Sequence, residues 1–286
     1  MRRFLRVSAI VLIALVLISA VLIYGFLHRW HIKKHTPDEL ASLLKPYMQI
    51  RTPEGNGPFP TIIGFHAGHI MRNEAGRIPK GYEDWADYLA GLGYATILVD
   101  SFSPRGILTQ DDIASTRFTL WGSERAGDVL VSLEEARKLS FVDVNQLALF
   151  GWSNGAWAIM DLFVIDPPNA LPTNLKTSTD QSLAGVKAAV LFYPYCNFPA
   201  KSRSHGWFQD IEVLMLMGGK DRVTEACLEI ATILKDNDQP ISTQVYPTAG
   251  HSFDAAYEEL PYSHNPEATS DARERVKKFL AQIFSK

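Results

Sequence analysis

The chain has 286 residues, of which 47% are hydrophobic and 11% aromatic, enough for one large folded core or two small ones. Six of the 28 basic residues and none of the acidic ones lie in the first 35 positions. The remaining chain therefore has 22 basic against 31 acidic residues, a formal charge of −9. An acidic body without a basic run argues against nucleic acid as a partner.

The N-terminal region contains a long apolar run. Val7–Leu27 has no charged residue and follows three arginines. As a helix it would span roughly 30 Å, the thickness of a bilayer core. The alternative is a cleaved signal peptide, whose apolar region usually has about 7–15 residues and ends in small ones. Here the only small pair, Ser19-Ala20, is followed by further apolar residues. We expect residues 1–35 to be a membrane anchor with one uncleaved transmembrane helix.

The charges around this run bear on its orientation. Three arginines and the N-terminal amine precede it, and three basic residues follow it within residues 29–34. This balance slightly favours an N-terminus on the cytoplasmic side. The catalytic body is then expected to be periplasmic or extracellular, attached to the membrane through Val7–Leu27.

Residues 36–57 are expected to form a stalk and a first strand, and residues 58–286 a single catalytic domain. In that domain, near-continuous apolar strands alternate with amphipathic helices, which indicates a mostly parallel, doubly wound α/β sheet covered on both faces. The expected strands are residues 59–66, 94–100, 145–150, 186–193, 211–217 and 241–246, and the expected helices 82–92, 121–140, 156–163, 223–235 and 271–284.

One strand runs directly into the motif Gly151-Trp152-Ser153-Asn154-Gly155. The G-x-S-x-G spacing is typical of a nucleophile elbow, a tight strand-to-helix turn that raises the serine Oγ above the sheet. The pattern also arises by chance, but the apolar strand before it and the apolar helix after it are the required context. Ser153 is therefore the candidate nucleophile. The amide of Asn154 would face an oxyanion at the helix N-terminus.

A serine nucleophile needs a base, and the base needs an acid that orients it. In α/β-hydrolases the chain order is Ser, Asp or Glu, His. Asp221 follows one expected strand and His251 follows the next, both at the carboxyl edge where sites of parallel sheets gather. Asp254 and Asp210 are alternative acids.

The loop after the first core strand, His66-Ala67-Gly68-His69, should supply the second oxyanion amide. We assign that amide to Gly68, with Ala67 as the alternative. His66 and His69 form an H-x-x-H pair, but a metal would need a third ligand. We interpret them as residues that brace the loop and expect neither a metal nor an organic cofactor.

Several segments together resemble the dienelactone hydrolase family of α/β-hydrolases, from about Pro58 to the C-terminus. The resemblance implies the α/β-hydrolase fold and hydrolysis of an ester or lactone. The chain has a serine where the family's namesake enzymes have a cysteine nucleophile. It also departs from the family by His66-Ala67 in place of His-Gly and by an apparent insertion at Asp166–Leu183. The matching segments are residues 93–106, with Asp-Ser-Phe-Ser-Pro-Arg-Gly the most distinctive run, and 141–143, 151–155, 192–196, 218–221 and 250–251.

Four further residues lie near the expected site. Trp152 and Tyr195 are candidate pocket residues, although large aromatics there can also be packing. Cys196 and Cys227 follow neighbouring strands, so a disulfide is expected, with two buried free thiols as the alternative. Arg105 is interpreted as a residue that ties loops together.

The sequence therefore predicts a serine-nucleophile hydrolase that cleaves a small carboxylic ester or lactone through an acyl-enzyme, with Ser153, Asp221 and His251 as the triad. A peptidase or acyltransferase with the same triad is the second hypothesis, because such enzymes differ in pocket and acceptor rather than in triad. An inactive, membrane-anchored binding scaffold is the third.

Overall fold

A seven-stranded sheet lies at the centre of the computed structural model, which describes residues 2–28, 33–72, 76–109, 111–112, 120–165, 170–179, 183–256, 259–260 and 263–285. The strand order is β1-β3-β2-β4-β5-β6-β7. Only β1 is antiparallel to its neighbour. The sheet is thus of the α/β-hydrolase kind, mostly parallel with one antiparallel edge. The strands are β1 (Met48–Arg51), β2 (Phe59–Phe65), β3 (Ala95–Val99), β4 (Val142–Trp152), β5 (Val186–Phe192), β6 (Glu212–Gly218) and β7 (Ile241–Tyr246).

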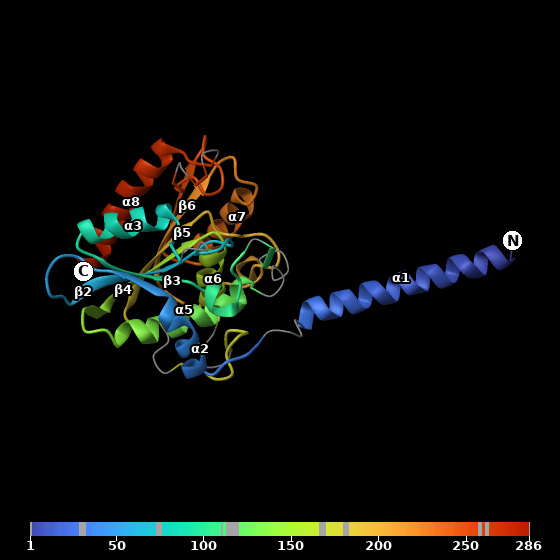
Figure 1. Cartoon of the computed structure of the whole chain (residues 1–286). Helices are drawn as coiled ribbons and strands as arrows, with labels where there is room; N and C mark the ends of the chain where they lie inside the picture. Colours follow the sequence, from blue (N-terminus) through green and yellow to red (C-terminus); the bar gives the residue numbers. More distant parts are fainter. Residues whose placement is uncertain are drawn as a thin grey trace.

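Helices cover both faces of the sheet (Figure 1). One face packs against α2, α5, α6 and α7, and the other against α3 and α8, each with its own buried apolar cluster. This two-sided cover explains why the central strands are apolar along their whole length. The helices are α1 (Arg2–His28), α2 (Pro37–Leu44), α3 (Lys80–Gly91), α5 (Gly122–Arg137), α6 (Asn154–Phe163), α7 (Thr224–Asp236) and α8 (Pro266–Phe284).

The prediction of a transmembrane helix over Val7–Leu27 is wrong. In the described part of the chain, no helix is long and apolar enough to cross a membrane. The side chains that the structure describes in α1 run only from Ile10 to Tyr24. The side chains of the other residues in the predicted span lie outside the described part.

The segment expected to be a stalk packs against the domain. Thr36 and Glu39 form a capping box that starts α2, and Leu40 and Leu44 are fully buried against the core. The signal was in the sequence as Thr-x-x-Glu before an apolar pair. β1 then pairs with β3 and closes that edge of the sheet.

The apparent insertion at Asp166–Leu183 is described at 170–179 and 183. The amide of His35 donates to the carbonyl of Asn174 at 2.9 Å, and the Lys176 amide donates to the carbonyl of His35 at 2.8 Å. The Asn174 side chain donates to Asp128 on α5. This part therefore packs along α5 and the entry of the chain, so the domain already includes His35. Residues 166–169 and 180–182 lie outside the described part.

Cys196 and Cys227 are joined by a disulfide, and both residues are fully buried. Cys196 follows β5, and Cys227 lies in the first turns of α7. The bond therefore ties the loop after β5 to the helix that begins just after Asp221.

Reducing this disulfide, or the double variant Cys196→Ala/Cys227→Ala, should lower the free energy of unfolding by about 3–4 kcal/mol. This is the chain-entropy value for a loop of about 30 residues. Urea unfolding of oxidised and reduced protein measures the difference. Equal midpoints would show that the bond does not constrain the unfolded chain, and quantitative alkylation of both thiols without reductant would show that it is not formed.

Candidate active site

The nucleophile elbow lies between β4 and α6. Ser153 has φ 50° and ψ −107°, a strained conformation for a residue with a side chain. A Cβ on Gly151 would lie 2.5 Å from the backbone of Ala156, and one on Gly155 would lie 2.0 Å from the carbonyl oxygen of Phe65. Only glycine fits at either position, so the two motif glycines are required by close backbone packing.

The structure brings Ser153, His251 and Asp221 together, as their places at the carboxyl edge predicted. The Ser153 Oγ lies 2.9 Å from His251 Nε2, and His251 Nδ1 lies 2.5 Å from Asp221 Oδ2. Because Asp221 accepts at Nδ1, that nitrogen carries the proton and Nε2 is free to accept the Ser153 proton. The Asp221 side chain is 6% exposed, whereas that of His251 is 40% exposed and open to solvent.

Two loops must meet for this geometry to form. The Lys220 amide donates to the carbonyl of Ala249 at 2.9 Å, and the Gly219 amide donates to that of Tyr246 at 2.8 Å. A Cβ on Gly218 would lie 2.4 Å from the carbonyl oxygen of Gly250. Glycine after β6 thus lets the acid loop lie directly on the histidine loop.

The loop after β2 is held so that one amide remains available. The Ala67 amide donates to the Tyr82 hydroxyl at 3.0 Å, so it is already used. Among the described residues, no backbone carbonyl accepts from the amides of Gly68 or Asn154. These two segments lie against each other, since a Cβ on Gly68 would be 3.5 Å from that of Asn154. Gly68 is therefore a better candidate than Ala67 for the second oxyanion amide.

Both loop histidines are fixed as neutral rings. His66 Nδ1 lies 2.7 Å from the carbonyl of Ala67, and its Nε2 accepts from the Ser101 amide at 3.1 Å. His69 Nδ1 lies 3.1 Å from the carbonyl of Ile70, so its Nε2 accepts from Tyr82. Burial lowers the pKa of both histidines, that of His66 strongly. In the described residues no group of histidines, cysteines and acids could hold a metal.

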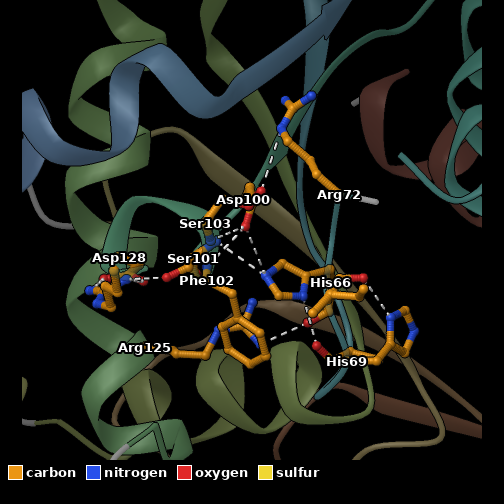
Figure 2. Close-up of polar contacts among 12 residues, drawn as sticks. His66, His69, Arg72, Asp100, Ser101, Phe102, Ser103, Arg125 and Asp128 are labelled. Carbon is orange, nitrogen blue, oxygen red and sulfur yellow. Dashed lines mark hydrogen bonds and ion pairs between the residues drawn. The ribbon is translucent and has the colours of Figure 1, made fainter. Parts of the chain in front are cut away.

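The loop after β3 lies against the loop of His66 and His69, as Figure 2 shows, and the Ser101 amide donates to His66. Asp100 accepts from the amides of Phe102 and Ser103 and pairs with Arg72. Arg105 donates to the carbonyl of Ser101 and forms a bidentate pair with Asp128 on α5. Arg105 thus ties loops together, in agreement with its interpretation from the sequence.

Asp254, the alternative acid, has a different position. Its Oδ2 accepts from the indole nitrogens of Trp85 at 2.8 Å and Trp152 at 2.9 Å, and its Oδ1 accepts from the Tyr193 hydroxyl at 2.7 Å. Burial raises the pKa of the carboxyl. Tyr193 in turn lies against His251, with ring centroids 4.7 Å apart. Sequence reasoning missed this cluster, because it joins distant segments and has no motif. Asp210 is not among the described partners of His251.

A cavity of about 330 Å³ lies next to the site: its lining includes Trp152 and Ser252, the chain neighbours of Ser153 and His251, but none of the triad residues. Tyr193, Ile70 and Ile78 also line it. Trp152 is therefore a lining residue, as the sequence suggested. Tyr195 is not among the lining residues. Its ring lies against Trp157, with centroids 4.9 Å apart, and its hydroxyl donates to the carbonyl of Phe198.

Replacing Asp221 by asparagine should slow the reaction of Ser153 with a fluorophosphonate probe by up to about 10⁴-fold, because an amide favours the wrong histidine tautomer. Asp254→Asn should instead mainly lower thermal stability, because the amide nitrogen replaces one of the two accepting oxygens and puts its donors towards the groups that donate to that oxygen. Labelling rates and melting temperatures of both variants test this. A greater loss of labelling in Asp254→Asn than in Asp221→Asn would reverse the assignment of the acid.

Comparisons with known proteins agree with this fold. The family model described as dienelactone hydrolase family matches residues 175–284, which include Asp221 and His251. No curated protein matches the sequence significantly.

Solved structures with this fold include esterases. A putative dienelactone hydrolase from Klebsiella pneumoniae is similar with a TM-score of 0.60 and 17% identity, covering 82% of this chain and 92% of that one. Esterase 2 from Thermogutta terrifontis, phosphoramylated by tabun, is similar with a TM-score of 0.62 and 16% identity, covering 82% of this chain and 89% of that one. At such identities the likeness shows the fold. Together with the family match, it confirms the resemblance to the dienelactone hydrolase family and supports a carboxylic ester hydrolase.

Proposed function

We propose that the protein is a serine hydrolase that cleaves small carboxylic esters or lactones through an acyl-enzyme. The observation that carries the proposal is the contiguous chain from Ser153 Oγ to His251 to Asp221, at 2.9 Å and 2.5 Å. The strained elbow and two amides next to the serine support it. Such a reaction needs a nucleophile, a base within hydrogen-bond reach and an acid that orients the base.

In the proposed mechanism His251 Nε2 takes the proton of Ser153 as Oγ attacks the ester carbonyl. The amides of Gly68 and Asn154 stabilise the oxyanion of the tetrahedral intermediate. His251 then gives its proton to the leaving alkoxide, which leaves an acyl-serine. A water molecule, deprotonated by the same nitrogen, attacks the acyl group. The bond between the acyl carbon and Oγ then breaks, His251 returns the proton to Ser153 Oγ, and the acid is released. Asp221 accepts the hydrogen bond from the protonated Nδ1 of His251 throughout.

Two other functions use part of this arrangement. A peptidase or acyltransferase would keep the triad and differ in the acceptor that enters after acylation. An inactive scaffold would keep the fold only, and the three aligned side chains argue against it. Labelling separates the scaffold from the enzymes, and product analysis with water, amines or alcohols as acceptors separates the enzymes from one another.

The disulfide supports a proposal on location. Disulfides persist in oxidising compartments and are rare in the cytosol of mesophiles. We therefore propose that the catalytic domain is located outside the cytoplasm, where the bond between Cys196 and Cys227 would be maintained. Non-reducing mass spectrometry of protein isolated from its native cells tests this.

Ser153→Ala should abolish hydrolysis of p-nitrophenyl acetate, with a loss of up to about 10⁶-fold in kcat, because the nucleophile is gone. Thermogutta terrifontis esterase 2 is described as phosphorylated by paraoxon and as bound to propionate and butyrate. By analogy paraoxon should modify this chain at Ser153, and short acyl esters are the first substrates to compare. Mass mapping of the phosphorylated peptide decides the site. Modification of the Ser153→Ala protein at the wild-type rate would refute the nucleophile.

The cavity next to the site is proposed to receive one apolar arm of the ester. Ile78→Phe, a change at its 8% exposed wall, should reduce its free volume. We expect kcat/KM to fall about tenfold for either p-nitrophenyl hexanoate or naphthyl acetate, and little for p-nitrophenyl acetate. A loss with p-nitrophenyl hexanoate would show that the cavity receives the acyl group, and a loss with naphthyl acetate that it receives the alcohol group. Ile233→Phe, the same change on the exposed side of α7, is the control. If Ile78→Phe changes kcat/KM by the same factor for all three esters, the cavity does not bind substrate.

A further inference from the structure

Arg125 is a fully buried cation on α5 with no ion-pair partner in the described part of the chain. The two acids that raise its pKa are paired with other arginines, Asp128 with Arg105 and Asp100 with Arg72. Burial lowers the pKa of Arg125 to about 10, so it remains charged at neutral pH. Burying a charge without a counter-ion costs several kcal/mol. Such an arrangement is unusual in a purely structural role.

The contacts of Arg125 lie on the two segments that carry the oxyanion amides. One guanidinium nitrogen, Nη1, donates to the carbonyl of His66 at 2.7 Å and to the side-chain oxygen of Asn154 at 2.7 Å. His66 begins the loop of Gly68, and Asn154 follows the nucleophile. Figure 2 shows Arg125 beside the oxyanion loop, with its guanidinium carbon 5.4 Å from the centre of the Phe102 ring.

The remaining donors of the guanidinium are not used. The Nε and Nη2 atoms of Arg125 are buried and have no hydrogen-bond partner among the described residues. Nη1 contacts two dipoles, the His66 carbonyl and the Asn154 side-chain amide. These two dipoles therefore balance only part of the guanidinium charge. A positive potential persists behind the loop, where the low dielectric screens it weakly.

We propose that Arg125 is the positioning residue of the oxyanion hole: it holds the Gly68 and Asn154 segments in register and adds a fixed positive charge behind them. This inference rests on the proposed function. Negative charge appears on the substrate oxygen only in the tetrahedral state, so the contribution of Arg125 should be greater in that state than for the bound ester. It should therefore appear in kcat rather than in KM.

Arg125→Met keeps the length and apolar contact of the side chain but removes the charge and both hydrogen bonds. We expect kcat for p-nitrophenyl acetate to fall roughly 10- to 100-fold with KM changed less than about threefold, a smaller loss than for a direct oxyanion donor. A trifluoromethyl ketone, which forms a tetrahedral adduct, should lose affinity in proportion. Arg125→Lys, which keeps the charge, should recover part of kcat.

The matched control is Arg137→Met on the same helix. Arg137 is also mostly buried, with 7% of its side chain exposed, and donates to a carbonyl, that of Ala184, away from the triad. It should lose stability without losing kcat. Asn154→Ala gives a second route if Arg125→Met does not fold, since it removes the acceptor and leaves the backbone amide. Because both variants remove the contact between Arg125 and Asn154, the losses in their double variant should be less than additive.

Hydrogen exchange provides a readout that does not depend on the substrate. Amides of residues 66–69 and 153–155 should exchange faster in Arg125→Met, but not in Arg137→Met. If wild-type protein hydrolyses no ester, the proposed function fails and exchange alone decides this inference. Unchanged exchange, a kcat within twofold of wild type, or equal losses in Arg125→Met and Arg137→Met would overturn it.

Discussion

The close approach of α6 to the end of β2 is the constraint on which the site depends. The backbone of Gly155 lies so near the Phe65 carbonyl that a Cβ would be 2.0 Å from its oxygen. This contact brings the first amide of α6 next to the loop after β2, two segments nearly ninety residues apart in sequence. It also leaves Ser153 in its strained conformation, because the chain must turn from strand to helix within one residue. The nucleophile and the candidate oxyanion amides are thus placed by one packing contact.

Much of the sheet and the triad geometry could be predicted from the sequence, for a physical reason. Strands buried on both faces are apolar throughout, and the residues that follow them must gather at one edge of a parallel sheet. Asp221 and His251 each follow a strand, so neighbouring strands bring them together. The predicted start of the last helix, residue 271, is too late: α8 begins at Pro266, because Asn265 caps the helix and proline favours its first position.

The rest of the site depends on contacts that leave no local pattern. Asp254 joins two tryptophans and Tyr193 from three other segments, and nothing near it in the sequence marks this role. Arg125 reads as an ordinary charge in the first turns of an amphipathic helix, yet it is fully buried. The transmembrane interpretation of Val7–Leu27 was based on the length of the uncharged run and its flanking arginines, but no helix in the described part of the chain is long and apolar enough to span a membrane.

The electrostatic state of the oxyanion side follows from how its groups are paired. The two loop histidines are neutral, because each has one ring nitrogen against a backbone carbonyl and the other accepting. The acids behind them are paired with Arg72 and Arg105. Arg125, which contacts the same loop, is charged and has no paired carboxylate among the described residues. A site whose other charges cancel needs little reorganisation when an anion forms, so a single fixed cation there acts on the transition state rather than on the neutral ester.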